Sequence, residues 1–322
     1  MVNLQRLAAL VVVATTLSTM AALGARAAWF LELFSHFALQ YLVLQAMAAV
    51  TCVALRRWSW ALVVVLASIP NLLAVGPYLP GLLSRPPVLV AAPKPGKDRP
   101  AVRLVAANLL YRQEDPTAVR AYLGRESPDL LVLSEFTPRW REKLRSLERT
   151  YPYFALRPRW NPWGIAVYSR YPFRAIENLD LGDDQSSHLR LLVELPDGLV
   201  ELYAVHLVSP SGPRQAAQRN TQLRRLAERI RAANPTLPKI VAGDFNITPY
   251  SPWFHDLLRD AGLRDGRQPF GLHVTWPAWP VPLWIPIDQC LARGPVDVTR
   301  VAAGPPIGSD HLPLECTFSL SS

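Results

Sequence analysis

The first quarter of the chain carries almost no charge, which limits what it can fold into. Between residues 1 and 84 the only Lys, Arg, Asp or Glu side chains are Arg6, Arg26, Glu32, Arg56 and Arg57. Apolar runs occupy about residues 7–24, 28–55 and 58–78. At about 1.5 Å per residue, the first run alone approaches the roughly 30 Å of a bilayer core. We therefore predict three transmembrane helices within residues 1–83.

The first apolar run has a second interpretation. Arg6 forms a short basic region before it, and Ala25-Arg26-Ala27 resembles a cleavage site, so the run is also typical of a signal peptide. Cleavage would leave two spans with both chain ends on one side of the membrane. We favour three uncleaved helices.

The positive charges around the spans indicate an orientation. Arg6 and the pair Arg56-Arg57 fall on one side if all three helices cross, which predicts a cytoplasmic N-terminus. Four basic residues between positions 85 and 99 favour the opposite orientation, with the side after the third span in the cytoplasm. Because the short Arg56-Arg57 turn is the cleaner signal, we expect a multi-pass protein of the cell membrane with residues 101–322 outside the cytoplasm.

A proline-rich segment at residues 84–100 follows the spans. It contains five prolines, a composition that favours extended and semi-stiff backbone. We predict a tether that holds the C-terminal domain near the membrane without fusing to it. Within the second span, Glu32 and His36 would share a helix face, and we expect Glu32 to lie at the membrane interface.

The remaining 238 residues have the texture of a globular α/β domain. They hold 30 of the 34 basic and 24 of the 25 acidic residues, a net charge of 30 − 24 = +6. Such a domain suits nucleic acid, anionic lipid head groups or phosphate substrates, and charge does not choose among them. Short apolar runs typical of buried strands alternate with two stretches typical of helices, residues 116–126 and 214–233.

Polar residues stand at or near the ends of six of these strand-like runs. The runs and their polar residues are 101–107 with Asn108, 129–133 with Glu135, 200–205 with His206, 239–242 with Asp244 and Asn246, 285–291 with Asp288, and 312–318 preceded by Asp310 and His311. A sheet that aligned the six runs would gather these side chains at one rim. The set predicts a site at that rim.

These motifs, in this order, resemble the endonuclease/exonuclease/phosphatase superfamily, which is DNase I-like. The resemblance covers about residues 101–320. It implies a four-layer α/β sandwich, with two mixed sheets face to face and helices outside. The implied reaction is hydrolysis of a phosphoester by in-line attack of water, with Mg²⁺ as the cofactor and Mn²⁺ as the alternative.

The resemblance also implies a role for each polar residue. Glu135 matches the metal-binding glutamate, Asn108 supports the metal site, and Asp310 belongs to the terminal pair and is assigned to the metal. Hard cations of this kind prefer oxygen ligands. The metal group is therefore Glu135, Asn108 and Asp310.

The other residues are assigned to the phosphate and the attacking water. Asp244 matches the aspartate that positions or deprotonates water, and Asn246 the amide that holds the phosphate. His206 matches a donor to a phosphoryl oxygen and so counts as both catalytic and substrate-binding. His311 is expected near the scissile phosphate with Asp288 fixing its tautomer, and its role as base or charge stabiliser stays open. Such groups suit the charge that develops on phosphorus.

Two features depart from the superfamily pattern. Gln289 stands where many relatives have a histidine. The loop Trp276–Pro286 is rich in proline and tryptophan; it either packs on the end of the sandwich or places its indoles at a membrane interface, where indole is favoured.

Three functions are compatible with the sequence. The first is a monomeric, membrane-anchored phosphoesterase acting on a lipid-linked phosphate or pyrophosphate; three spans before such a domain resemble bacterial glycopeptide-resistance membrane proteins of the superfamily. The second is a membrane-attached nuclease, for which nucleic acid would be the partner. The third is an inactive binding module, which the complete set of acidic, amide and imidazole residues disfavours.

Overall fold

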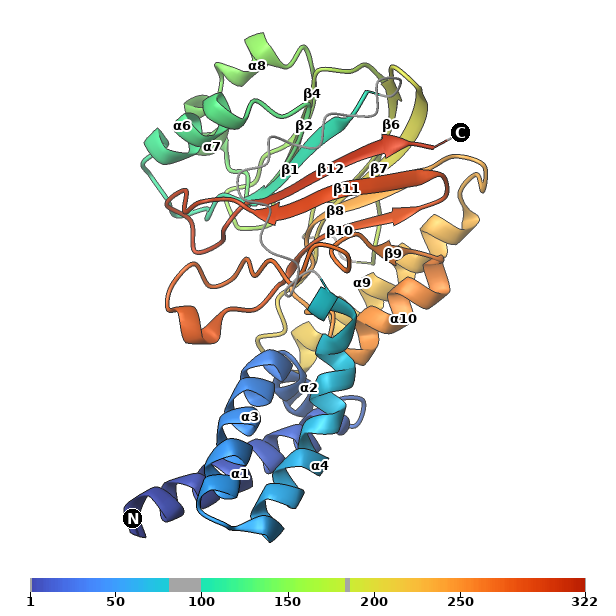
Figure 1. The fold of residues 1–322 in the computed structure, drawn as a ribbon. Coiled ribbons are helices and arrows are strands. Elements are labelled where there is room, and N and C mark those ends of the chain that lie inside the picture. Colours follow the sequence, from blue (N-terminus) through green and yellow to red (C-terminus); the bar gives the residue numbers. More distant parts are fainter. Residues whose placement is uncertain (1, 81–99, 183–185, 322) are drawn as a thin grey trace.

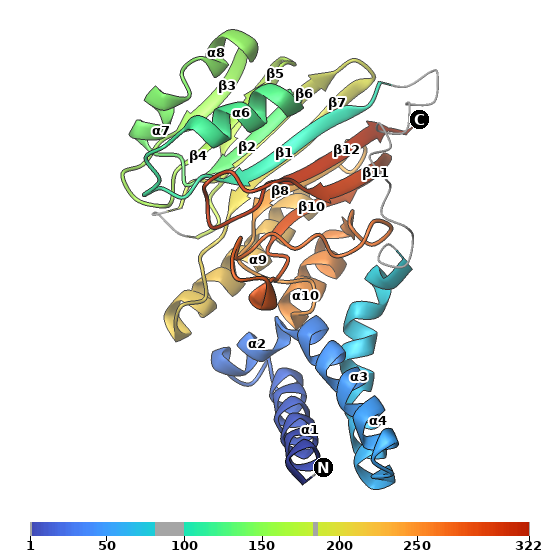
Figure 2. The ribbon, with the colours of Figure 1, turned by 60° about the vertical axis from the view of Figure 1, so that its left-hand side comes forward.

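The computed structural model describes residues 2–80, 100–182 and 186–321, which form a helical bundle and an α/β sandwich (Figure 1). The helices α1 to α4 project from one end of the sandwich (Figure 2). The predicted tether at residues 84–100 lies outside the described residues, apart from Pro100.

The N-terminal region contains four helices and a short 3-10 turn. They are α1 (Val2–Leu23), α2 (Trp29–Ser35), α3 (Ala38–Ala54), α4 (Trp58–Val75) and η1 (Gly76–Tyr78). By length and composition Asn3–Leu23 and Trp58–Tyr78 are able to cross a membrane. The predicted span at residues 28–55 is not one straight helix, because α2 and α3 are bent by 59° at the break between them. This pair makes a third span only if it is counted as one bent element.

Three buried polar side chains join the long helices. Asn71 Nδ2 of α4 donates to Thr19 Oγ1 of α1 at 2.8 Å and to Gln45 Oε1 of α3 at 2.9 Å, and Gln45 Nε2 donates to Thr19 Oγ1 at 3.1 Å. Around this trio the outward side chains are apolar and exposed, so the hydrogen bonds are made inside the bundle. These hydrogen bonds link α1, α3 and α4 to one another.

The sandwich has two six-stranded mixed sheets. In the first, the strand order is β11-β12-β1-β2-β4-β3, and in the second it is β5-β6-β7-β8-β10-β9. The first sheet contains β1 (Val102–Asn108), β2 (Leu130–Ser134), β3 (Tyr153–Arg157), β4 (Ile165–Ser169), β11 (Val296–Ala303) and β12 (Leu314–Leu320). The second contains β5 (Phe173–Asn178), β6 (Leu189–Leu195), β7 (Gly198–His206), β8 (Lys239–Asp244), β9 (Arg264–Asp265) and β10 (Asp288–Arg293).

Helices cover the outer face of each sheet, which completes the four layers. Outside the first sheet lie α6 (Thr117–Glu126), α7 (Pro138–Lys143) and α8 (Leu147–Thr150), and outside the second lie α9 (Pro213–Ala232) and α10 (Pro252–Ala261). One hydrophobic core lies between the sheets and another lies under each outer layer of helices. The expected α/β sandwich of two mixed sheets with helices is confirmed.

The polar strand ends come from both sheets, which corrects the expectation of one aligned sheet. β1 and β2 run parallel in the first sheet, and β7 and β8 run parallel in the second. Because β10 is antiparallel to β8, its first residue Asp288 lies opposite the last residue Asp244. β12 is antiparallel to β1, so the loop before it reaches the end where β1 stops. The site therefore lies where the same ends of two stacked sheets meet.

The bundle also packs directly on the sandwich, through contacts that were not predicted from the sequence. Glu32 is 1% exposed, and its Oε2 accepts a hydrogen bond of 2.5 Å from Arg219 Nη2 of α9 while its Oε1 accepts one of 2.7 Å from Ser251 Oγ. His36 Nδ1 lies 2.9 Å from Thr248 Oγ1. Glu32 and His36 thus face the domain through α2 and the bend that follows it.

Candidate active site at the shared sheet edge

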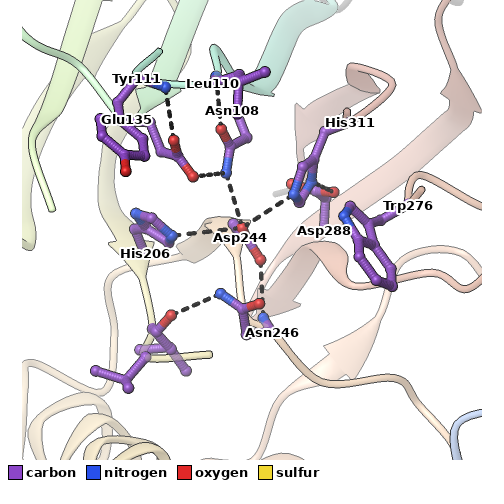
Figure 3. Close-up of polar contacts among 12 residues, drawn as sticks. Asn108, Leu110, Tyr111, Glu135, His206, Asp244, Asn246, Trp276, Asp288 and His311 are labelled. Atoms are coloured by element: carbon purple, nitrogen blue, oxygen red, sulfur yellow. Dashed lines mark hydrogen bonds and ion pairs between the residues drawn. The ribbon is translucent and has the colours of Figure 1, made fainter. Parts of the chain in front are cut away.

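Asp244, the last residue of β8, lies at the centre of the site (Figure 3). Its side chain is 1% exposed. Asn108 Nδ2 donates to its Oδ2 at 3.1 Å, and the backbone N–H of Asn246 donates to its Oδ1 at 2.9 Å. His206 Nε2 and His311 Nε2 lie 3.5 Å and 3.7 Å from Oδ2. Four of the predicted residues thus converge on one carboxylate.

Asn108 connects the two sheets. Besides Asp244, its Nδ2 donates to Glu135 Oε1 at 3.1 Å, and its Oδ1 accepts from the Leu110 N–H at 3.0 Å. Glu135 Oε2 in turn accepts from the Tyr111 N–H at 2.7 Å. Because Glu135 Oε1 and Asp244 Oδ2 each lie 3.1 Å from the same Asn108 nitrogen, the distance between these two oxygens is at most the sum of the two. Asn108 acts here by orienting both carboxylates.

Unusual backbone conformations place several of these side chains. Leu110, Glu135 and Asn246 have φ values of +56°, +56° and +50°, in the left-handed region that non-glycine residues rarely adopt. Gly243 has φ +137°, and a Cβ there would lie 2.0 Å from the Val205 carbonyl oxygen. Strain of this kind persists where the surrounding structure enforces it, and it is common at active sites.

His311 and Asp288 form a buried pair. Their atoms Nδ1 and Oδ2 lie 2.9 Å apart, and both side chains are nearly inaccessible. Burial alone lowers the pKa of His311, but the carboxylates of Asp288 and Asp244 outweigh it and raise the pKa to about 10. For Asp244, burial raises the pKa and His311 opposes the rise. Asp288 contacts Nδ1 of the imidazole, as predicted from the sequence, and Nε2 lies toward Asp244.

His206 and Asn246 border the same centre. Trp163 packs against the His206 ring with centroids 5.2 Å apart, and the backbone N–H of His206 donates to His188 Nδ1 at 3.3 Å. Asn246 Nδ2 donates to the Leu207 carbonyl at 2.8 Å. That carbonyl holds the amide beside the β7 end, so Asn246 presents its side chain at the mouth of the site.

Asp310 differs from the other predicted residues. Its side chain is exposed, and its Oδ2 accepts from Trp276 Nε1 at 3.3 Å. Among the described residues, the tight group of carboxylate and imidazole ligand atoms is instead Asp244, Asp288 and His311, whose atoms all lie within 4.8 Å of one another. Asp310 therefore borders the site and holds the tryptophan loop.

Two buried residues, Arg219 and Gln289, hold the loop after Asp244 in place and were not predicted as site residues from the sequence. Arg219, 0% exposed, donates through Nη1 to the Asn246 carbonyl at 3.1 Å and through Nη2 to Glu32. It lies in an arginine-rich helix whose basic face is otherwise largely solvated, so no local signal distinguishes it. Gln289, the departure from the superfamily pattern, is buried and donates to the Ile247 and Pro286 carbonyls. It braces the loop after Asp244.

A model of the Endonuclease/Exonuclease/phosphatase family matches residues 105–311. Solved structures share the fold. A humanized D. rerio TDP2 gives a TM-score of 0.56 at 20% identity and covers 68% of this chain and 98% of its own. An endonuclease/exonuclease/phosphatase from Beutenbergia cavernae gives 0.56 at 21% identity, with 70% and 72% covered. The human Nocturnin catalytic domain with bound sulfate gives 0.55 at 19% identity, with 69% and 96% covered. No curated protein matches the sequence.

Proposed function

Because the chain belongs to the Endonuclease/Exonuclease/phosphatase family, whose members hydrolyse phosphoester bonds and depend on divalent metals, we propose that it is a metal-dependent phosphoesterase of the cell membrane. Its substrate is a lipid-linked phosphate or pyrophosphate outside the cytoplasm. The observation that carries the proposal is the convergence of Asn108, His206, Asn246 and His311 on the buried carboxylate of Asp244.

From this convergence we infer a chemical role for each group. Asp244 accepts the proton of the attacking water, which forms a bond to phosphorus as the bond to the leaving oxygen breaks. His311, held by Asp288, donates through Nε2 to a phosphoryl oxygen and stabilises its developing charge. His206 and Asn246 hold the phosphate from the other side.

The donors at the site fit a divalent cation. Glu135 is half-buried, its two oxygens are oriented by Asn108 and by the Tyr111 N–H, and the Asp244 carboxylate lies close by. An oxygen-rich set of this type suits Mg²⁺ or Mn²⁺. Bound there, the cation would polarise a phosphoryl oxygen and offset the negative charge of the substrate.

The bundle supports the membrane location. Its outward face exposes large apolar side chains on all three long helices, for example Leu10 at 65%, Val50 at 71% and Leu73 at 72%. Surfaces this apolar mark membrane or protein contacts. By length and composition α1 and α4 suit a bilayer, and α2 with α3 makes a third span if the bent pair is counted as one element.

The basic residues of the bundle support the orientation. Arg57 Nη2 donates to Gln5 Oε1 at 3.1 Å, and Arg6 lies in the same hollow. This end of the bundle is the one farthest from the sandwich (Figure 1). With basic residues on the cytoplasmic side, the sandwich lies outside the cytoplasm.

The tryptophan loop supports a lipid-linked substrate. At its tip Trp279, Val281 and Leu283 are 78%, 45% and 47% exposed. The loop lies against the bundle, because Gln40 Nε2 of α3 donates to the Trp284 carbonyl at 2.8 Å. An apolar tip beside the bundle suits contact with a membrane interface, where indole is favoured.

A comparison of substrates tests the proposal. Purified full-length protein in detergent is assayed with farnesyl pyrophosphate, bis(p-nitrophenyl) phosphate and single-stranded DNA, each with Mg²⁺ and with excess EDTA. We expect release of phosphate from farnesyl pyrophosphate that EDTA abolishes, with the highest kcat/KM of the three. Preference for DNA would establish the nuclease instead, and no turnover of any substrate would establish the binding module.

A further inference from the structure

A partly open, largely apolar cavity lies between the helical bundle and the catalytic loop. It has a volume of about 290 Å³, just below the roughly 300–1,000 Å³ typical of ligand pockets. From the bundle it is lined by Leu33, His36 and Phe37, and from the sandwich side by Asn246 and Trp276, among others. The cavity therefore opens beside two residues that border the catalytic centre.

The orientation of α2 explains how the cavity arises. Glu32 and Ser35 are buried on the side of α2 that faces the domain, and Glu32 is held there by Arg219. Phe30, Leu33 and Phe34 follow the i, i+3, i+4 spacing of one helix face. Phe30 is 52% and Phe34 37% exposed. A continuous apolar face thus runs from the outer surface of the bundle to the cavity.

The cavity wall is fixed from both sides. Arg219 joins the Glu32 carboxylate to the Asn246 carbonyl, and His36 Nδ1 contacts Thr248 Oγ1 at 2.9 Å. The bend between α2 and α3 brings Phe37 toward the catalytic loop. A straight helix over residues 28–55 would not produce this wall, so the break has a structural consequence at the site.

We propose that this cavity binds the first part of a single hydrocarbon chain whose phosphate lies at Asp244 and Asn246. The inference rests on the proposed function and narrows its substrate class to single-chain phosphates such as prenyl pyrophosphates. The volume accommodates one chain segment, and the apolar face of α2 leads the rest of the chain toward lipid. Asn246 marks the junction, because it lines the cavity and its backbone N–H donates to the Asp244 carboxylate.

Chain length provides the first test. Phosphate release is measured for dimethylallyl, geranyl and farnesyl pyrophosphate, and for a short-chain diacyl phosphatidate. Each buried methylene contributes about 0.8 kcal/mol, or about fourfold. We therefore expect kcat/KM to rise at least about tenfold from dimethylallyl to geranyl and then to level off when the cavity is full. Equal values along the series, or preference for phosphatidate, would overturn the inference.

Filling the cavity provides the second test. In Leu33→Trp the indole occupies the cavity, and we expect kcat/KM for geranyl pyrophosphate to fall at least about tenfold relative to that for bis(p-nitrophenyl) phosphate. Ser211→Trp fills it from the exposed sandwich side and guards against loss of helix docking. Leu62→Trp adds the same indole to a 60% exposed position on α4 and serves as the control.

A binding measurement separates failure of the inference from failure of the proposed function. The affinity of geranyl monophosphate is measured by isothermal titration for wild type, Leu33→Trp, Ser211→Trp and Leu62→Trp. Weaker binding in Leu33→Trp and Ser211→Trp, with unchanged binding in Leu62→Trp, supports the cavity even if no substrate is hydrolysed. Unchanged binding in Leu33→Trp and Ser211→Trp would contradict it even if the enzyme is active.

Discussion

At the scale of single residues, a small number of hydrogen bonds orients many of the side chains in the site. One Asn108 amide bridges Glu135 and Asp244, and one carboxylate, that of Asp288, fixes the His311 ring. Partners that orient a ligand are nearly as consequential as the ligand itself. Residues of the two sheets therefore act as one unit, and their substitutions should not be additive.

Glu135→Gln tests the assignment of the metal. The amide keeps the size of the side chain but loses the negative charge, so we expect the Mg²⁺ concentration for half-maximal activity to rise about 10- to 100-fold. Activity at saturating Mg²⁺ should recover in large part. Asp310→Asn is the matched comparison; since Asp310 is exposed and holds Trp276, its Mg²⁺ dependence should change less. A larger shift in Asp310→Asn would transfer the metal role to that residue.

At the scale of elements, the contact between α2 and α9 determines how the bundle meets the domain. The Glu32–Arg219 pair is almost fully buried. Removing one partner of such a pair leaves an uncompensated charge and costs about 3–5 kcal/mol, whereas replacing both with apolar residues is often neutral. The pair supports the catalytic loop through the Asn246 carbonyl.

A double replacement tests this account of the contact. We expect Arg219→Met to lower the melting temperature in detergent and to reduce activity, and Glu32→Leu/Arg219→Met to recover most of the stability. Arg224→Met, on the exposed face of the same helix, is the control. If Arg219→Met melts like the control, the ion pair does not hold the two parts together.

The elements that sequence predicts well are those set by local pattern. Strand ends such as Asn108 and Asp244 follow from apolar runs and motifs, and the helix expected at 214–233 is α9 at Pro213–Ala232. The break between α2 and α3 at His36 cannot be predicted from local pattern, because the contacts made there involve Thr248 and Arg219, which are distant in sequence. The distribution of the strands over two sheets likewise depends on long-range pairing.

At the scale of the whole molecule, the active-site end of the sandwich faces the bundle (Figure 2). The bend after α2, the loop after Asp244 and the tryptophan loop meet there. If the bundle crosses a membrane as proposed, the catalytic centre lies close to the bilayer surface. A substrate anchored in the bilayer would then reach it without leaving the lipid.

The position of the loop tip beside the bundle predicts a selective effect. Trp279→Ala removes a side chain that is 78% exposed, so the fold should be unaffected. We expect lower activity on farnesyl pyrophosphate in vesicles and unchanged activity on bis(p-nitrophenyl) phosphate, because the indole contributes only at the membrane interface. Trp160→Ala, 73% exposed elsewhere, is the control. An equal loss on both substrates would contradict interfacial contact.

The most direct test of the central claim is phosphate release from farnesyl pyrophosphate by wild type, Asp244→Ala and His311→Ala in Mg²⁺, with circular dichroism confirming that all three are folded. The account predicts Mg²⁺-dependent turnover by the wild type and a fall in kcat of at least about 10²- to 10⁴-fold in each variant. Turnover that either folded variant retains at the wild-type rate would contradict it.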